Sequence, residues 1–260
     1  MTASLRARLA GGERLLAIFN LIPATEIIEL VAIAGFDVVI VDMEHGPHEL
    51  SDVRQAILAA EAAGLHTVVR VRTSAAASIG AVLDLGANGV LVPQIESAEH
   101  AVRAVRAARF APRGERGANP WVRAARYGQR ENWFATADDD VATLVMVEGR
   151  AALTELPEIL AVPGLDAIFL GPMDLSHSLG VPGQIDHPSV VDRLESAVRL
   201  AAGHGVATGL FAPGVGRAAH WWGRGAGLVA SGVDTEVIRS AMSGATAAAH
   251  SAAAGRPATA

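Results

Sequence analysis

The sequence contains no cysteine and no lysine, so all 21 residues counted as lysine or arginine are arginine. The absence of cysteine excludes disulfides, thiolate nucleophiles and cysteine-ligated metal sites. The absence of lysine excludes every mechanism that needs a lysine amine: Schiff-base aldolases, pyridoxal phosphate enzymes and Walker-type phosphate binding. If this protein performs carbonyl chemistry, a metal ion or an arginine must supply the electrophile.

Basic tracts and long apolar runs are also missing. A formal net charge of −6, with no arginine stripe interleaved with aromatic residues, argues against a nucleic-acid partner. The longest apolar runs are strand-sized and fall far short of the roughly 20 residues needed to span a bilayer, so we expect no membrane partner. The N-terminal stretch lacks the features of a signal peptide, and we therefore expect a cytoplasmic protein.

The pattern of apolar and polar segments predicts an α/β fold with a single domain, residues 1–260. Half of the chain, 51%, is hydrophobic, and short apolar runs alternate with segments of helical periodicity. Eight such units match a (β/α)8 TIM barrel. A doubly wound sheet usually has a glycine-rich turn after its first strand, and "LLAIFNLIPATE" has none. We expect strands at Leu15–Asn20, Asp37–Asp42, Thr67–Arg72, Gly89–Gln94, Thr143–Glu148, Asp166–Gly171, Ala207–Phe211 and Gly227–Ser231.

One long segment, residues 111–140, interrupts this alternation. Its length, its five arginines and its aromatic residues suggest a functional loop over a site. The alternative is a surface excursion that only packs on the barrel. The Ala-rich C-terminal segment begins as a helix, and we expect it to fray after residue 255.

Titratable residues follow several of the expected strands, and in this barrel the catalytic groups come from the C-terminal ends of the strands. Each also has an ordinary structural explanation. The acids can cap helices, the histidine can be a solvated loop residue, and the arginine can bridge loop carbonyls. The set comprises Asp42, Glu44, His45, Arg70, Glu148 and Asp174.

Together these residues favour a metal-assisted reaction. Glu148 and Asp174 follow consecutive strands, and two hard oxygen ligands suit Mg²⁺ or Mn²⁺, with Co²⁺ as a further candidate. A 2-oxo acid can chelate such an ion through its carboxylate and keto oxygens. The metal would polarise the ketone, Arg70 would neutralise the developing enolate, and His45 would move protons. Asp42 or another acid could hold the histidine ring in its working orientation.

At these residues the sequence resembles the HpcH/HpaI family of metal-dependent class II pyruvate aldolases, which includes 4-hydroxy-2-oxoheptanedioate and 2-dehydro-3-deoxyglucarate aldolases. The resemblance covers roughly Leu15 to Ile238, and "D-x-E-H-G" followed by "G-P-x-D-L-S" is its most specific part. The matching pieces, in the family's order, are "AGFDVVIVDMEHGPHE", "VVRVR", "LDLGANGVLVPQIESAE", "RGERG", "VEGRAALTELPEILAVPGLDAIFLGPMDLSHSLG" and "SGVDT".

The resemblance implies a barrel of the phosphoenolpyruvate/pyruvate type. It implies assembly into dimers and a hexamer, a trimer of dimers, with the C-terminal helix exchanged between subunits. It also implies Glu148 and Asp174 as metal ligands, Arg70 as the pyruvate and enolate contact, and His45 as the acid/base supported by Asp42.

Two further implications concern other segments. Asp84, which by itself reads as an exposed helix acid, matches an acid that the family donates from a neighbouring subunit. The segment Gly171, Pro172, Met173 and Asp174 would hold the substrate carboxylate through its backbone amides. The chain departs from some members at Met146, where they have glutamine, and at Met173, where they have alanine, so the pocket is expected to be narrower or more apolar.

These features predict an aldehyde-lyase that cleaves a 4-hydroxy-2-oxo acid reversibly to pyruvate, or a close 2-oxo acid, and an aldehyde through a metal-stabilised enolate. One alternative is a related enolate lyase acting on an acyl-CoA, such as citryl- or malyl-CoA, although the only basic docking patch is formed by Arg113, Arg116, Arg123 and Arg126. The other is a non-catalytic barrel that binds a metal–oxo-acid complex. A proton carrier at His45 argues against it, because binding alone needs none.

Overall fold

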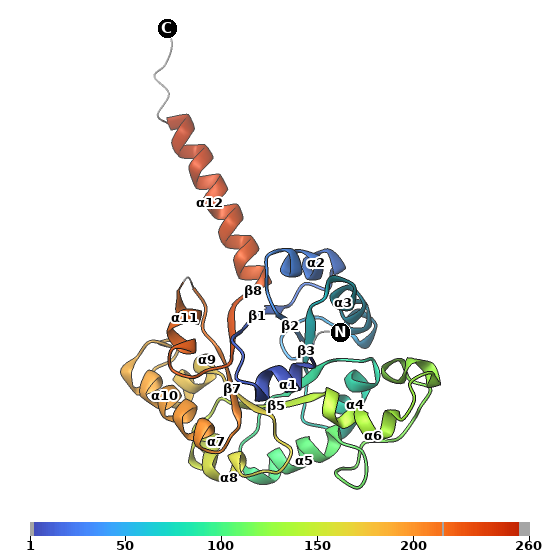
Figure 1. Cartoon of the computed structure of the whole chain (residues 1–260). Helices are drawn as coiled ribbons and strands as arrows, with labels where there is room; N and C mark the ends of the chain where they lie inside the picture. The colour runs from blue at the N-terminus through green and yellow to red at the C-terminus, as the bar shows by residue number, and fades with distance from the viewer. Residues whose placement is uncertain (1–2, 215, 255–260) are drawn as a thin grey trace.

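A computed structural model describes residues 3–214 and 216–254 of the protein (Figure 1). Eight parallel strands form a closed barrel in the order β1 to β8, each hydrogen-bonded to its neighbours in the chain. The predicted TIM barrel is confirmed, and no strand boundary differs from the expected one by more than two residues. The strands are β1 Leu15–Asn20, β2 Val38–Asp42, β3 His66–Arg70, β4 Gly89–Val92, β5 Ala142–Val147, β6 Ala167–Leu170, β7 Ala207–Phe211 and β8 Leu228–Val233.

The strands are apolar throughout because both faces of a parallel barrel are buried. Side chains alternate between two cores, as the period of two in a strand requires. Val38 and Ile40 of β2 point into the barrel interior, whereas Val39 and Val41 pack beneath the surrounding helices. This alternation decides which residues at the ends of the strands face the mouth of the barrel.

Helices surround the barrel, and the first of them closes its N-terminal end. Leu5 and Leu9 of α1 are buried in the same interior cluster as the strand side chains. The helices after the strands are α2 Thr25–Ile33, α3 Leu50–Ala63, α4 Ala76–Asp84, α5 Ala98–Ala108, α7 Arg150–Thr154, α8 Leu156–Leu160, α9 Pro172–Ser178, α10 Pro188–Gly203 and α11 Arg217–Trp222, while α1 spans Leu5–Ala10.

The segment 111–140 contains more regular structure than the loop expected from the sequence, and it lies at the N-terminal ends of the strands. It contains the 3-10 helix η1 Arg123–Gly128 and the helix α6 Trp133–Asp140. Ala125, Trp133 and Ala137 form a small core there with Phe110. Because α5 returns the chain to the N-terminal ends of the strands before the segment begins, the segment does not cover the C-terminal mouth of its own barrel. Within one chain, the segment therefore fits the alternative expectation, a surface excursion that packs on the barrel.

The last helix, α12 Asp234–Ala254, projects away from the barrel (Figure 1). Its first residues contact β1 and β8, and the remainder extends into solvent. The expected fraying after residue 255 lies outside the described residues. Among the described helices, none combines the length and apolar character that crossing a membrane requires.

Candidate active site

The C-terminal mouth of the barrel collects the polar residues that continue the inward-facing series of the strands. Asp42 follows Val38 and Ile40, Arg70 follows Val68, and Glu148 stands two residues after Met146. Since alternate residues share a face, each of these side chains points toward the barrel axis. The sequence therefore places three charged groups at one mouth through strand geometry alone.

Arg70 and Asp42 form a buried ion pair at the floor of this mouth. Arg70 Nε donates to Asp42 Oδ1 at 2.9 Å and Nη2 donates to Oδ2 at 2.5 Å, and both residues are buried. Burial alone would lower the pKa of Arg70, but its hydrogen bonds and attraction to Asp42, with the charges of Glu44 and Glu148, raise it above the ordinary value. The guanidinium also lies 4.9 Å from the centre of the Phe19 ring. Arg70 is thus a permanently charged, fixed cation.

Asp42 also fixes the turn that carries His45. Its Oδ1 accepts hydrogen bonds from the backbone N–H of Glu44 at 3.0 Å and of His45 at 3.2 Å. The side chain of His45 is 65% exposed, and its Nε2 lies 4.0 Å from Glu44 Oε2. Asp42 therefore positions the histidine through its backbone, and Glu44 is the acid that stands beside the ring. The sequence allowed Asp42 or another acid to support the ring, and Glu44 is the acid that lies beside it.

Glu148 and Asp174 are the carboxylates at this mouth whose oxygens could hold a cation. Glu148 Oε1 accepts from the backbone N–H of Gln94 at 2.8 Å, and a methyl group added at Gly171 would lie only 2.9 Å from Glu148 Cβ. Burial raises the pKa of Glu148, and the nearby charges of Glu44 and Asp174 raise it further. Carboxylates that repel one another around an open space are the donor set that a divalent cation neutralises.

This donor set fits a cation that keeps most of its ligands as water or substrate. Within residues 3–214 and 216–254, no three histidine, cysteine or acidic side chains are grouped as a metal site. Mg²⁺ is commonly held by one or two carboxylates and retains several waters. Glu44 Oε2 is buried without a hydrogen bond from any described group. This oxygen forms an ion pair with Arg70 Nη1 at 3.2 Å, and it can still accept a hydrogen bond from a water at this site.

Replacing Glu148 by glutamine is expected to raise the melting temperature of the metal-free protein. Burial raises the pKa of Glu148 in the folded protein, so ionisation of this carboxylate destabilises the fold. The full penalty applies above the folded pKa and is lost as the pH falls below the pKa of the unfolded chain. Thermal unfolding in EDTA at about pH 8 and about pH 5 should show a larger gain at the higher pH. Glu96→Gln, an exposed acid on the same rim, is the control. A lower melting temperature for Glu148→Gln at both pH values would contradict this electrostatic account.

The segment after β6 forms one wall of the mouth. Gly171 precedes α9, which begins at Pro172, so the first amides of this helix have no partner within it. The N–H of Gly171 itself donates to Val147 O at 3.2 Å. The amides of Met173 and Asp174 are therefore the ones that could hold a substrate carboxylate.

The cavity between these groups has a volume of about 380 Å³ and is mostly apolar. Met146 Sδ lies 3.7 Å from Arg70 Nη1, and Met173 is 44% exposed at the rim. The aromatic part of the wall was not singled out in the sequence, although Phe19 and Phe169 belong to the same inward-facing series as the interior core. The lining residues are Phe19, Leu21, Asp42, His45, Arg70, Met146, Phe169, Gly171, Pro172, Met173, Asp174, Phe211 and Val233.

Asp84 is the one predicted site residue that stands apart. It ends α4, which runs from the C-terminal to the N-terminal ends of the strands, so it lies at the opposite end of its own barrel from His45. Its Oδ1 accepts from Arg116 Nη2 at 2.7 Å, and its side chain is 35% exposed. Within one chain Asp84 therefore does not reach the catalytic mouth.

A closed (β/α)8 barrel whose C-terminal mouth joins a fixed arginine, a histidine and two neighbouring carboxylates defines a TIM-barrel enzyme, because the catalytic groups of this fold lie at that end of the strands. Residues 17–241 match the model of the HpcH/HpaI aldolase/citrate lyase family. The chain belongs to that family.

Relatives that resemble the chain over nearly its whole length agree with this assignment. A 2-keto-3-deoxy-L-rhamnonate aldolase of Escherichia coli O1:K1 is 36% identical over 93% of this chain and 91% of its own. The crystal structure of an HpcH/HpaI aldolase/citrate lyase family protein from Burkholderia cenocepacia J2315 aligns with a TM-score of 0.91 and 35% identity, over 96% of this chain and 100% of that one. The citrate synthase SbnG aligns with a TM-score of 0.87 and 30% identity, over 96% and 98%. The chain is thus an enzyme of the carbon–carbon lyase class.

Proposed function

We propose that the protein catalyses the metal-dependent, reversible cleavage of a 4-hydroxy-2-oxo acid to pyruvate, or a close 2-oxo acid, and an aldehyde. The observation that carries this proposal is the meeting of three functions at one mouth of the barrel, where Arg70, His45 and Asp174 line a cavity and Glu148 stands behind its Gly171 wall. Arg70 is a fixed cation, Glu148 and Asp174 are carboxylates that form no ion pair within residues 3–214 and 216–254, and His45 is an exposed proton carrier at the rim. Retro-aldol chemistry needs each of them.

A divalent ion held by Glu148 and Asp174, Mg²⁺ or Mn²⁺ with Co²⁺ as a further candidate, would polarise the keto group of the substrate. His45 accepts the proton of the C4 hydroxyl, directly or through a water, as the C3–C4 bond breaks and the aldehyde forms. The electron pair of that bond passes to the 2-oxo fragment as an enolate, whose negative oxygen lies against the Arg70 guanidinium. Return of this proton to C3, from His45 directly or through a water, then gives the methyl group of pyruvate and restores the neutral histidine. The amides of Met173 and Asp174 hold the carboxylate throughout.

Release of pyruvate from a panel of 4-hydroxy-2-oxo acids of varied length and charge tests this function. We expect turnover with Mg²⁺, Mn²⁺ or Co²⁺ and none in EDTA, with activity restored when the metal is returned. Borohydride added with the substrate is expected to leave the enzyme active, because the chain has no lysine to form a Schiff base. Full activity in EDTA would contradict the proposal. Cleavage of malyl-CoA in place of every free acid would favour the acyl-CoA alternative.

We also propose that the chain works as a homo-oligomer. The specific form is a hexamer, a trimer of dimers whose subunits exchange their C-terminal helices. The free projection of α12 supports this assembly (Figure 1). On α2, Leu30 is 59% and Ile33 81% exposed, and on α12 Met242 is 66% exposed. Apolar side chains exposed in this way are typical of surfaces that another subunit covers. We further propose that the protein is cytoplasmic, as expected from its sequence.

Mixed oligomers provide a test of the proposed role of Asp84 across a subunit boundary. His45→Gln and Asp84→Asn are each expected to inactivate the enzyme. If each site takes His45 from one chain and Asp84 from its neighbour, random mixing of the two variants should restore about a quarter of the sites. Activity of the mixture equal to that of the separate variants would contradict this role. The melting temperature of Asp84→Asn shows whether loss of the Arg116 ion pair unfolds the chain.

A further inference from the structure

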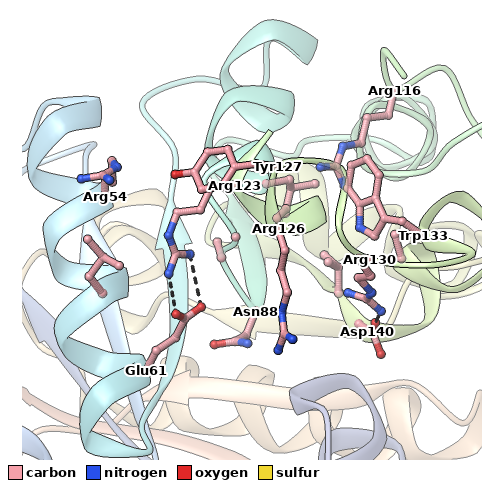
Figure 2. Close-up of a pocket in the computed structure, with 17 residues that line it drawn as sticks. Arg54, Glu61, Asn88, Arg116, Arg123, Arg126, Tyr127, Arg130, Trp133 and Asp140 are labelled. Carbon is pink, nitrogen blue, oxygen red and sulfur yellow. Dashed lines mark hydrogen bonds and ion pairs between the residues drawn. The ribbon is translucent and has the colours of Figure 1, made fainter. Parts of the chain in front are cut away.

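A second cavity, with a volume of about 600 Å³, lies on the outer side of the barrel away from the catalytic mouth (Figure 2). It is bounded by α3, by the end of α4 with the turn before β4, and by the segment that contains η1 and α6. Its volume falls within the range of small-molecule sites in proteins. None of its lining residues belongs to the mouth. They are Arg54, Leu58, Glu61, Leu83, Gly86, Ala87, Asn88, Arg116, Arg123, Ala124, Arg126, Tyr127, Arg130, Trp133, Ala137, Asp140 and Val141.

The charge of this cavity is opposite to that of the whole chain. Five arginines and two carboxylates line it, giving a formal charge of +3 in a protein whose net charge is −6. The two carboxylates are already engaged, since Glu61 pairs with Arg123 and Asp140 pairs with Arg130 (Figure 2). Arg54 and Arg126 have no carboxylate partner among residues 3–214 and 216–254. Two cations are therefore left for a ligand.

The wall around these two arginines is held in place by other contacts. Arg116 is buried, with its guanidinium 4.6 Å from the centre of the Phe110 ring and 5.6 Å from that of Trp133. Its Nε is buried without a hydrogen-bond acceptor among the described groups. Such a donor is costly to leave unpaired, and the guanidinium that carries it forms part of the cavity wall.

The backbone that carries Arg126 is strained. Arg126 and the following Tyr127 have φ values of 50° and 53°, in the left-handed region that non-glycine residues rarely adopt. In Figure 2 the Arg126 side chain extends between the Arg123–Glu61 and Arg130–Asp140 pairs, with Asn88 near its end in this view. Strain of this kind persists where the surrounding structure imposes it, and it often marks a binding site. Here it places a cationic and an aromatic side chain at one cavity.

From the cavity, its unpaired arginines and this backbone we infer that the protein binds a small organic dianion here, one that carries a phosphate group or two carboxylates. Arg54 and Arg126 are the anion-binding residues, because a guanidinium matches both groups with two parallel hydrogen bonds. Tyr127 offers its ring at the rim to the organic part of the ligand. The site is separate from the catalytic mouth of the same chain, with which it shares no lining residue.

Calorimetric titration of the full chain in EDTA tests this site with three probes: inorganic phosphate, 3-phosphoglycerate and succinate. EDTA removes divalent ions from the catalytic mouth, so the result does not depend on the proposed lyase activity. We expect saturable binding of at least one probe, with the pattern of affinities distinguishing phosphate from dicarboxylate. The double variant Arg54→Ala/Arg126→Ala should bind about tenfold or more weakly. Arg54→Lys/Arg126→Lys should fall between it and the natural protein.

The matched control is Arg103→Ala/Arg193→Ala, which removes the same charge from exposed helix positions outside the cavity. It should bind like the natural protein, and every variant is checked for an unchanged melting temperature without ligand. The inference is overturned if no probe binds saturably, if the control weakens binding as much as the double variant, or if pyruvate displaces the probe. A change in oligomer mass caused by Arg54→Ala/Arg126→Ala would also overturn it, since the cavity would then be an interface between copies of the chain.

Discussion

Replacing Arg70 by leucine is expected to lower kcat by about 10²- to 10³-fold, because it removes a fixed cation from the position where the enolate charge develops. The same change leaves Asp42 buried without its bidentate partner, which should destabilise the fold by about 3–5 kcal/mol. Steady-state assays of pyruvate release, corrected for the folded fraction measured by thermal unfolding, separate the two effects. Arg70→Lys should recover part of the stability and less of the activity, since an ammonium cannot reproduce the planar fork.

Arg109 provides the matched control for this experiment. It is buried like Arg70, and its Nη2 pairs with Asp166 Oδ2 at 2.6 Å. The pair lies at the N-terminal ends of the strands, because Asp166 immediately precedes β6. Arg109→Leu should therefore destabilise the protein while leaving kcat per folded molecule close to normal. Equal losses of kcat in the Arg70 and Arg109 variants would show that Arg70 acts only through stability.

Replacing His45 by glutamine is expected to lower kcat by about 10²- to 10⁴-fold, the usual contribution of a general acid/base. The melting temperature should stay close to that of the natural protein, because the His45 side chain is 65% exposed and its turn is held by the backbone hydrogen bonds to Asp42. His204→Gln, at the exposed C-terminal end of α10, is the control. A His45→Gln enzyme with more than a tenth or so of normal kcat would assign proton transfer to another group.

Much of the catalytic mouth could be predicted from the sequence because strand geometry sets it. Once β2 is recognised by its apolar run, the alternation of Val38 and Ile40 with Val39 and Val41 determines that Asp42 faces inward. The same reasoning applies to Arg70 after Val68. Eight apolar segments separated by helical patterns leave few alternatives to a barrel, and for that reason the strand limits agree closely.

Other features depend on loop geometry and could not be predicted in this way. The use of the Asp42 carboxylate for backbone amides, with Glu44 beside the His45 ring, follows from the shape of one turn. The left-handed φ of 58° at Gln94, which directs its N–H to Glu148, has no sequence signal such as glycine. The placement of segment 111–140 could have been deduced, since a helix after β4 must return the chain to the N-terminal ends of the strands.

The cavity lined by Arg54 and Arg126 shows the same limit. Its residues come from three separate segments. Only the three-dimensional structure shows that Arg123 and Arg130 are paired with acids, whereas Arg54 and Arg126 have no carboxylate partner in the described part of the chain. The five arginines of segment 111–140 indicated an unusual local charge. The sequence did not show which carboxylates they pair with or where in the fold they lie.

The central claim is that this mouth forms an enolate from a 2-oxo acid with the help of a divalent ion. Exchange of the methyl protons of pyruvate with D₂O, followed by NMR, tests it without knowledge of the aldehyde. We predict rapid exchange with Mg²⁺ or Mn²⁺, exchange at the uncatalysed rate in EDTA, and a large reduction in Arg70→Lys. Failure of the metal-loaded natural protein to exchange these protons above the rate of metal alone would contradict the account.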